Sequence, residues 1–494
     1  MAKSAKWTGK HGTGSWFDAR NWAGGVPNAV ETTIFSDGGT WAISLAGRGA
    51  AQAGSMTVTG DALTFSAGTL DLTAPAPKKG ATNDLIVKGA GSVTIAAGAT
   101  LTAQTNILLG ANSHGTESAG TLAIAGSVAT PNLFAWIGSL EVTGPGGNLT
   151  TTNELIVGAT MEISAGGTVT GGTGANAALI VGSGASSGNG TVVVDGAGSS
   201  IDIAQIYLGD GSAGSLTVQN GATVTTPDLN AGNAGDGYLL VTGAGSVFNA
   251  TGMIIGGQAP VSSSVSITAG GSLAIGANGL TLIEGTLALD ATAQLSGGAV
   301  TSLGGTIEAL AETGKQAGTA TLLQQLSLGT DEYDRNQLTT VFSTGGAVLN
   351  LAGGVQTSGA ALLGVTGGDV VLSNAGDNYA GTEIFNGTLA IATTGAAGTG
   401  DIMFMTGGTA PSVLQVEAGV DFSNAISQFY TNDVIDLQGF AFDSSITGTI
   451  NGDVLTLHDN SGTTSLTLVN GTYTDKSFVF SADHGGGTLI KYHG

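Results

Sequence analysis

The chain has 494 residues, of which 86 are glycine, 10% are charged, 5% are aromatic and none is cysteine. An apolar content of 41% is too high for a disordered polar tract. The net charge of −23 argues against nucleic acid and anionic membranes as partners, because phosphate binding needs clustered Lys or Arg. No apolar run is long enough for a membrane span.

Residues 1–45 contain four of the five tryptophans, Trp7, Trp16, Trp22 and Trp41, together with Phe17. A stack of repeats must close its apolar end, and bulky aromatic side chains suit that purpose. We therefore predict an N-terminal cap that also takes part in assembly; a surface on which these rings stack against sugars is the alternative. The first residues lack the apolar core of a cleavable signal peptide, so we expect another export signal.

A short apolar strand that ends in glycine recurs through residues 46–314. Its copies are 107–110, 135–138, 155–158, 179–182, 206–209 and 253–256, with a less regular copy at 229–232. A second strand with alternating apolar residues lies between them, as at 121–124 and 215–218. A third element, Gly-Ala-Gly-Ser, precedes Val or Ile. These elements define units of 20 to 28 residues with two or three strands each.

Alternation places every second residue of such strands on one face. A single unit cannot bury that face alone, whereas stacked units share one interior and satisfy their backbone groups by parallel pairing. Gly and Asn suit the corners that need a positive φ. We therefore predict an all-β fold, a right-handed parallel β-helix (solenoid). A sandwich array or a propeller fits less well, because propeller blades need about 40 to 50 residues.

The repeat pattern breaks at 315–345, where the stretches 322–326 and 331–335 contain little glycine. This predicts an insertion, either a short helix or an exposed loop, followed by further solenoid repeats over 346–430. From 431 to 494 the strands are longer and more charged, which predicts a separate C-terminal β module.

Residues 89–314 contain no Lys or Arg, so this part of the solenoid lacks the basic residue that lyases of acidic polysaccharides need. The acidic residues of the region form no close pair in the sequence, and the five histidines are dispersed. We therefore predict no enzyme activity; a carbohydrate-active β-helix enzyme or a carbohydrate-binding module is the alternative. Asp210 and Asp236, each in a Gly-Asp-Gly turn, are candidate Ca²⁺ ligands, with a plain turn role as the alternative. No other cofactor is expected.

Residues 371–391, VLSNAGDNYAGTEIFNGTLAI, resemble the passenger repeat of bacterial autotransporter adhesins. The opening 14–27, GSWFDARNWAGGVP, is similar to the start of the same group of extracellular repeat proteins. Residues 392–494 do not match the translocator barrel of that family, so we expect another export route. Instead, 432–440 and 485–490 resemble the C-terminal region of type I secreted, RTX-associated proteins, although the calcium-binding GGxGxD array is missing. This resemblance implies an uncleaved export signal, with Asp433, Asp436, Leu437, Gly486, Gly487 and Thr488 at the matching positions.

The repeats and the resemblance together predict a secreted structural or adhesive protein of the cell surface or extracellular matrix of a Gram-negative bacterium. Uncapped coil ends are templates for pairing with another chain, and contact between unlike ends gives open filaments or layers. We expect the Trp-rich segment of one copy to meet the C-terminal module of another. The expected partners are further copies of the chain and cell-surface or matrix polysaccharide.

Overall fold

In the computed structural model 58% of the residues are in strands and 1% in helices, and the parallel coils form a β-solenoid of about 16 turns. The structure describes residues 4–47, 49–73, 83–110, 118–174, 176–184, 188–257, 261–311, 318–330, 338–357, 359–405, 411–460 and 462–493. The chain divides into two compact units. Unit 1 is Met1–Ser264 with Gly270–Ala274, and unit 2 is Val265–Ala269 with Ile275–Gly494. The predicted solenoid is confirmed. No described helix has the length and apolar character needed to cross a membrane.

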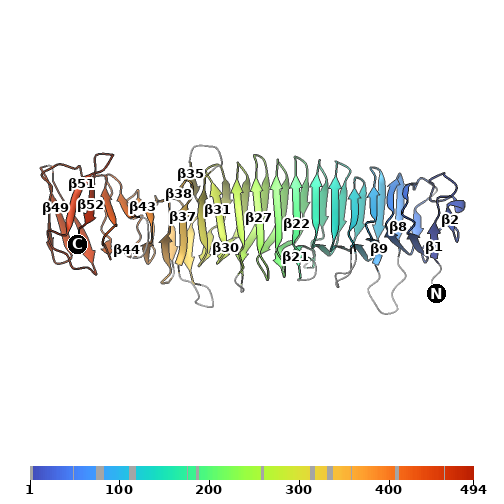
Figure 1. Cartoon of the computed structure of the whole chain (residues 1–494), viewed down its shortest axis with the longest axis horizontal. Helices are drawn as coiled ribbons and strands as arrows, with labels where there is room; N and C mark the ends of the chain where they lie inside the picture. Colours follow the sequence, from blue (N-terminus) through green and yellow to red (C-terminus); the bar gives the residue numbers. More distant parts are fainter. Residues whose placement is uncertain are drawn as a thin grey trace. The chain divides into compact units, whose positions relative to one another are not determined.

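In unit 1 most coils contribute three short strands, and equivalent strands of successive coils pair in parallel to form three stacks (Figure 1). The first stack contains β4 (Thr40–Ser44), β7 (Ala62–Ser66), β10 (Ser92–Ile95), β13 (Gly120–Ile124), β16 (Gly138–Thr143), β19 (Thr160–Ser164), β22 (Gly190–Asp195), β25 (Gly214–Gln219) and β27 (Gly237–Thr242). The second stack contains β5 (Ala51–Ala53), β8 (Gly68–Leu72), β11 (Ala99–Ala103), β14 (Ser127–Thr130), β17 (Asn148–Thr151), β20 (Thr168–Gly171) and β23 (Ser200–Asp202). The third stack contains β1 (Ser4–Trp7), β3 (Thr32–Phe35), β6 (Ser55–Thr59), β9 (Asn83–Lys88), β12 (Asn106–Leu109), β15 (Asn132–Ala135), β18 (Glu154–Val157), β21 (Ala178–Ser183) and β24 (Gln205–Asp210).

Two long strands continue the second and third stacks together: β26 (Thr223–Ala231) pairs with both β23 and β24, and then with β28 (Val247–Gly256). At the N-terminus, the 3-10 helix η1 (Ala19–Asn21) leads into β2 (Trp22–Ala23), which pairs antiparallel with β1. The coils therefore stay stacked in parallel to the end of unit 1, with a register shift between Asn106 and Ile107 where β12 pairs with β9.

Alternate residues of the strands make the interior. In the first stack Leu122 aligns with Leu140, and Leu140 aligns with Met161. All three are fully buried, while the residues between them in sequence lie outside. Each such burial contributes about 1.5 to 3 kcal/mol, so these ladders supply much of the stability.

One predicted repeat is out of phase. The sequence pattern aligned 135–138 with 107–110, but the observed register pairs Leu109 with Ala135. Gly138 instead begins β16 at a φ of 122°, and a Cβ there would collide with the carbonyl of Gly120. Glycine is therefore required at this corner.

The less regular copy at 229–232 is a true repeat. Leu229 pairs with Ile206 on one side and with Met253 on the other. It is 2% exposed, as an interior position requires.

Unit 2 also has three stacks. The β31 stack contains β31 (Thr286–Asp290), β34 (Thr306–Leu310), β37 (Leu338–Ser343), β40 (Leu362–Val365), β42 (Gly381–Ile384), β44 (Asp401–Phe404) and β46 (Ala425–Ser427). The β33 stack contains the end of β30 (Ser272–Ile283), then β33 (Val300–Leu303), β36 (Leu326–Gly329) and β39 (Val355–Thr357). The β35 stack contains β35 (Thr319–Leu322), β38 (Val348–Leu351), β41 (Asp369–Leu372), β43 (Gly387–Ile391), β45 (Ser412–Val416) and β47 (Val434–Leu437). Two further strands are β29 (Ser264–Thr268) and β32 (Gln294–Gly297).

For the segment 315–345 a short helix or an exposed loop was predicted, and its described part contains strands instead of the helix. Strands β35, β36 and β37 lie within it, and each pairs in parallel with a strand of the next coil. Leu322 and Leu326 are fully buried, because one ends β35 and the other begins β36 around a corner where Leu323 is exposed. Residues 331–335, the other half of the predicted insertion, lie outside the described residues.

The C-terminal end of unit 2 changes from parallel to antiparallel pairing. Strand β47 pairs antiparallel with β52 (Thr488–Tyr492), and β52 pairs antiparallel with β51 (Phe478–Ala482). Beside them β48 (Thr447–Asn451), β49 (Val454–His458) and β50 (Thr463–Val469) form an antiparallel meander, whose last strand pairs in parallel with β46. This arrangement stops the propagation of parallel coils.

Candidate functional site: the N-terminal cap

The tryptophans of the N-terminal cap form one aromatic cluster. The rings of Trp7 and Trp16 each lie edge-on to Trp22, with centroids 4.8 Å apart. Phe35 and Phe65, on strands of the first complete coils, contact this cluster at centroid distances of 6.0 and 6.2 Å. The cluster therefore joins the cap to the interior of the solenoid.

Burial distinguishes the tryptophans from one another. Trp7, Trp16 and Trp22 are at most 6% exposed, so their rings are not accessible for stacking on a sugar. Trp41 is half-buried and Phe17 is 36% exposed. The cap geometry thus favours closure of the apolar end over the sugar-stacking alternative.

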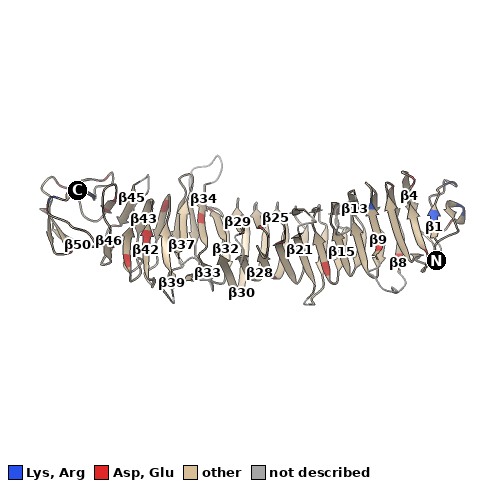
Figure 2. Cartoon of the chain, turned by 60° about the horizontal axis from the view of Figure 1, so that its bottom comes forward, with Lys and Arg blue, Asp and Glu red and all other residues tan. Residues whose placement is uncertain are grey.

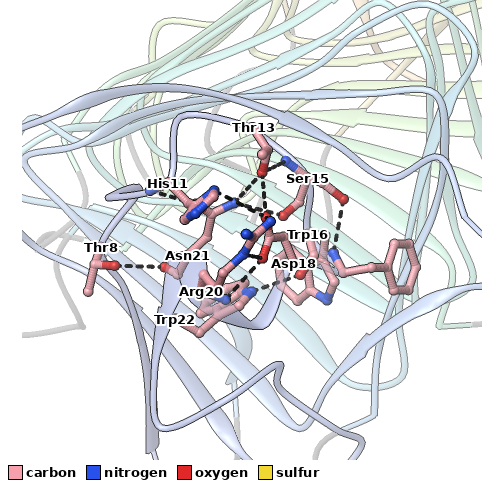
Figure 3. Close-up of polar contacts among 10 residues, drawn as sticks. Thr8, His11, Thr13, Ser15, Trp16, Asp18, Arg20, Asn21 and Trp22 are labelled. Carbon is pink, nitrogen blue, oxygen red and sulfur yellow. Dashed lines mark hydrogen bonds and ion pairs between the residues drawn. The ribbon is translucent and has the colours of Figure 1, made fainter.

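A polar network covers the cluster (Figure 3). The guanidinium of Arg20 donates two hydrogen bonds of 2.9 Å to the carboxylate of Asp18, and Thr13 donates a third. These bonds, with that of Arg20 first, hold the pKa of Asp18 well below its usual range. The buried Asn21 accepts from the backbone of His11 and donates to Thr13 and to the Ser15 carbonyl. The network fixes the loop that places Trp16 and Trp22.

Asp61 anchors the other side of the cap. This carboxylate is 1% exposed and accepts the backbone N–H groups of Asp37 and Gly39 and the indole N–H of Trp41. It therefore holds the cap loop against the first stack. No sequence pattern indicates this role, because Asp61 lies 20 residues after Trp41.

Segments that contain the residues predicted to form an export signal are brought together in unit 2. Leu437 pairs with Thr488 and Asp436 with Leu489 in the antiparallel β47–β52 ladder, so two segments distant in sequence become neighbours. Thr488 donates its hydroxyl to the carbonyl of Phe440. Gly487 donates its N–H to Asp483, and the neighbouring Gly486 adopts a φ of 99°.

Acidic groups gather around this ladder. Burial is the main cause that raises the pKa of Asp436, and the nearby Asp483 and Glu417 add to it. Burial also raises the pKa of Asp433 to about 6, although its carboxylate accepts the N–H of Tyr430. The module therefore holds carboxylates that are costly to ionise.

A groove of 620 Å³ opens beside these acids, between the ends of β45 and β47 and the first half of β50. Val416, Leu437 and Leu466 are apolar residues that line it, and Glu417 and Asp421 add carboxylates. Residues 463–466 pair with β49 on one side, whereas β46 pairs only with 467–469 on the other. In the described part of the chain, this half of β50 thus has a free strand edge.

The calcium candidates have ordinary structural partners. Asp210 accepts a hydrogen bond from the side chain of Asn233, and Asp236 accepts one from the backbone of Ser262. Within the described ranges no three His, Cys, Asp or Glu side chains gather as metal ligands. Calcium at these positions stays a prediction.

Aromatic residues of the C-terminal module were missed by the sequence analysis. Phe404, Phe429, Phe478, Tyr473 and Tyr492 form a chain of ring contacts with centroids 5.5 to 6.5 Å apart. Residues 404–492 contain ten Phe and Tyr, an enrichment that could have indicated a second aromatic cap.

Comparisons with protein families, with curated proteins and with solved structures found no match to this chain.

Proposed function

We propose that this chain is a secreted structural or adhesive protein of the bacterial surface or extracellular matrix, which assembles end to end into filaments or layers. The observation that carries the proposal is the difference between the two chain ends. One end is a Trp-filled cap and the other is an antiparallel module with an acidic groove. Contact between unlike surfaces forms an open filament when the rotation between successive copies does not close a ring.

The two ends have opposite charge tendencies. Residues 1–45 contain four basic and three acidic side chains, whereas 431–494 contain seven acids and two lysines. Lys6 keeps 44% of its side chain exposed while it bonds to Asp37, and Lys10 is exposed. Because basic residues are otherwise rare in this chain, this end is the best complement to the acidic module.

Export is the second part of the proposal. The β47–β52 ladder, with Asp433, Asp436, Leu437, Gly486, Gly487 and Thr488, is the proposed C-terminal secretion signal. Its support is the sequence resemblance, together with the proximity of the two segments in one ladder.

Assembly is tested by reversing charge at one end while the buried cap is left intact. The variant K6E/K10E is compared with K476E/K491E, which makes the same change of net charge on the C-terminal module. Electron microscopy and light scattering at low salt should show filaments or layers for the wild type and the control, and monomers for K6E/K10E. Adding D421K to K6E/K10E should restore assembly in part.

Monomeric wild type under all salt and calcium conditions would contradict the assembly proposal. Equal assembly by K6E/K10E would refute the role of the N-terminal charges. The enzyme alternative is checked separately, because purified protein that releases reducing ends or unsaturated products from polysaccharides would replace this proposal.

A further inference from the structure

The outward face of the third stack in unit 1 carries an unusual row of large apolar side chains. The register aligns Ile86 with Leu108, Leu108 with Phe134, Phe134 with Ile156, Ile156 with Ile180 and Ile180 with Tyr207. These six residues, one per coil, are named the apolar ladder: Ile86, Leu108, Phe134, Ile156, Ile180 and Tyr207.

The ladder points away from the interior. Its sequence neighbours, such as Ile107 and Leu109 around Leu108, are fully buried, so the pleat directs the ladder outward. Leu108 and Ile156 keep 8% of their surface exposed, because in-register neighbours pack against one another along a ladder. The equivalent outward row of the first stack is instead polar over five coils: Thr121, Ser139, Thr160, Thr191 and Ser215.

Amide side chains lie beside the apolar ladder, two residues earlier on three of its six strands, at Asn106, Asn132 and Gln205. Asn83 lies three residues before Ile86, and Glu154 and Ala178 occupy the two positions between Asn132 and Gln205. Asn132 donates to the side-chain oxygen of Asn106 at 2.9 Å, and Asn106 donates to that of Asn83 at 3.4 Å. Gln205 continues the row on β24 and accepts from the hydroxyl of Tyr207. A carboxamide has two N–H groups, so Asn106 and Asn132 each keep one for an external acceptor.

An aromatic pair lies at the centre of this strip. The rings of Phe134 and Trp136 are stacked, with centroids 5.9 Å apart and planes within 9°. Both are partly exposed. Six coils at about 4.8 Å each give a strip about 24 Å long, and the amide row lies about 7 Å to its side.

Charge limits what this strip can bind. Lys88 lies on β9, two residues after Ile86, at one end of the strip. Residues 89–314 contain no Lys or Arg, and the cartoon of Figure 2 shows no basic strand residue between β13 and β25. Glu154 lies in the amide row and Asp210 at the end of β24. Along the strip beyond Lys88 an anionic ligand would be repelled by these carboxylates, and the same face of a second copy would bring carboxylates together.

We propose that the apolar ladder and its amide row bind an uncharged polysaccharide chain. Sugar rings combine an apolar C–H face with a rim of hydroxyl groups. The C–H faces would lie on the partly exposed Phe134 and Trp136, and on Ile86, Ile180 and Tyr207 farther along the strip, while Leu108 and Ile156 are buried between them. The hydroxyls would hydrogen-bond to the amides of Asn106 and Asn132. The site is on the side of unit 1, so it does not depend on end-to-end assembly.

The test is affinity electrophoresis of the full chain in gels containing one of three uncharged polysaccharides: hydroxyethylcellulose, galactomannan or dextran. Polygalacturonate serves as the acidic comparison. The variant F134S/W136S removes the aromatic pair. Y238S is the matched control, because Tyr238 is 38% exposed on the first stack, away from the strip. The variant N132D adds a carboxylate with little change of shape.

The wild type and Y238S should be retarded by at least one uncharged polysaccharide. F134S/W136S should bind at least tenfold more weakly, and N132D should also bind more weakly. If circular dichroism shows that F134S/W136S does not fold, N132D alone decides.

Three results would overturn the proposal: retardation by none of the uncharged polysaccharides, retardation by polygalacturonate alone, or unchanged binding by the folded ladder variants. Loss of self-association in F134S/W136S with unchanged polysaccharide binding would assign the strip to a protein contact instead.

Discussion

Asp377 offers a pH-dependent test of the packing in unit 2. Its side chain is 7% exposed and lies between β41 and β42, where Oδ1 accepts the N–H of Val355 at 2.8 Å and Oδ2 is buried without a hydrogen bond. Burial raises the pKa of this carboxyl to about 7, and the single bond from Val355 only partly offsets that rise. Asp377 is therefore protonated in the folded chain under mildly acidic conditions.

The direction of the pH effect on stability follows from the protonation of Asp377 in the folded and the unfolded chain. An unfolded Asp has a pKa of about 3.9, so between that value and pH 7 the folded chain holds a proton that the unfolded chain has lost. The stabilisation from Asp377 is thus complete below about pH 4 and is lost as the pH rises to 7. A shift of about 3 units corresponds to at most about 4 kcal/mol, and local relaxation reduces this to about 2 kcal/mol.

Asp377→Asn removes the titration and keeps an acceptor for Val355. The variant should be about 1 to 3 kcal/mol more stable than the wild type at pH 8, and the difference should vanish or reverse near pH 4. Urea midpoints from far-ultraviolet circular dichroism between pH 4 and 8 measure this difference. Because a solenoid can unfold in parts, hydrogen exchange in peptides that contain Val355 should follow the same trend.

The control for this experiment is Asp401→Asn, a change at an exposed carboxylate on β44 of a neighbouring coil. It should leave the pH dependence unchanged. Equal pH dependence for the wild type and Asp377→Asn would show that Asp377 ionises freely in the folded chain, and the argument from burial would then be wrong.

Three further changes test the cap and the corners, each by urea denaturation. Trp16→Ala should cost about 3 to 5 kcal/mol, because it empties a fully buried position in the aromatic cluster. Asp61→Ala should cost about 2 to 4 kcal/mol, since it removes the acceptor of two backbone N–H groups and of the Trp41 indole. Gly138→Ala should destabilise far more than Gly98→Ala. Both glycines have positive φ, but only at Gly138 would a Cβ meet backbone atoms. Equal effects of the two glycine changes would contradict the observed register.

The solenoid could be predicted because its interior follows a local rule. In strands such as β13, Leu122 and Ile124 alternate with small outward residues, and this period is visible without knowledge of the neighbouring coils. Glycine at corners adds a second local signal. The number of strands per coil and the stacking of coils then follow from the repeat.

The predictions that were wrong share one cause. An apolar residue in the sequence does not show whether its side chain points into the solenoid or outward. Leu322, Leu323 and Leu326 have a spacing that suits a helix face, yet two of them are buried on successive strands and the third is exposed at the corner between them. Trp136 lies after the end of β15, and its apolar side chain made the sequence pattern place the repeated strand at 135–138. Only the register between coils separates inward from outward positions.

The same limit explains why the strip on the third stack is invisible in the sequence. Phe134 lies next to the interior residue Leu133, and Ile156 lies between Leu155 and Val157, so each reads as part of one buried apolar run. Stacking turns these runs into two ladders with opposite directions, one that fills the core and one on the outer side of the sheet, where Leu108 and Ile156 remain 8% exposed. The core needs only the first of these ladders, and the polar outward row of the first stack shows that a coil is complete without the second. Core packing does not account for large apolar side chains at six successive outward positions, and this row is the observation on which the proposed polysaccharide site rests.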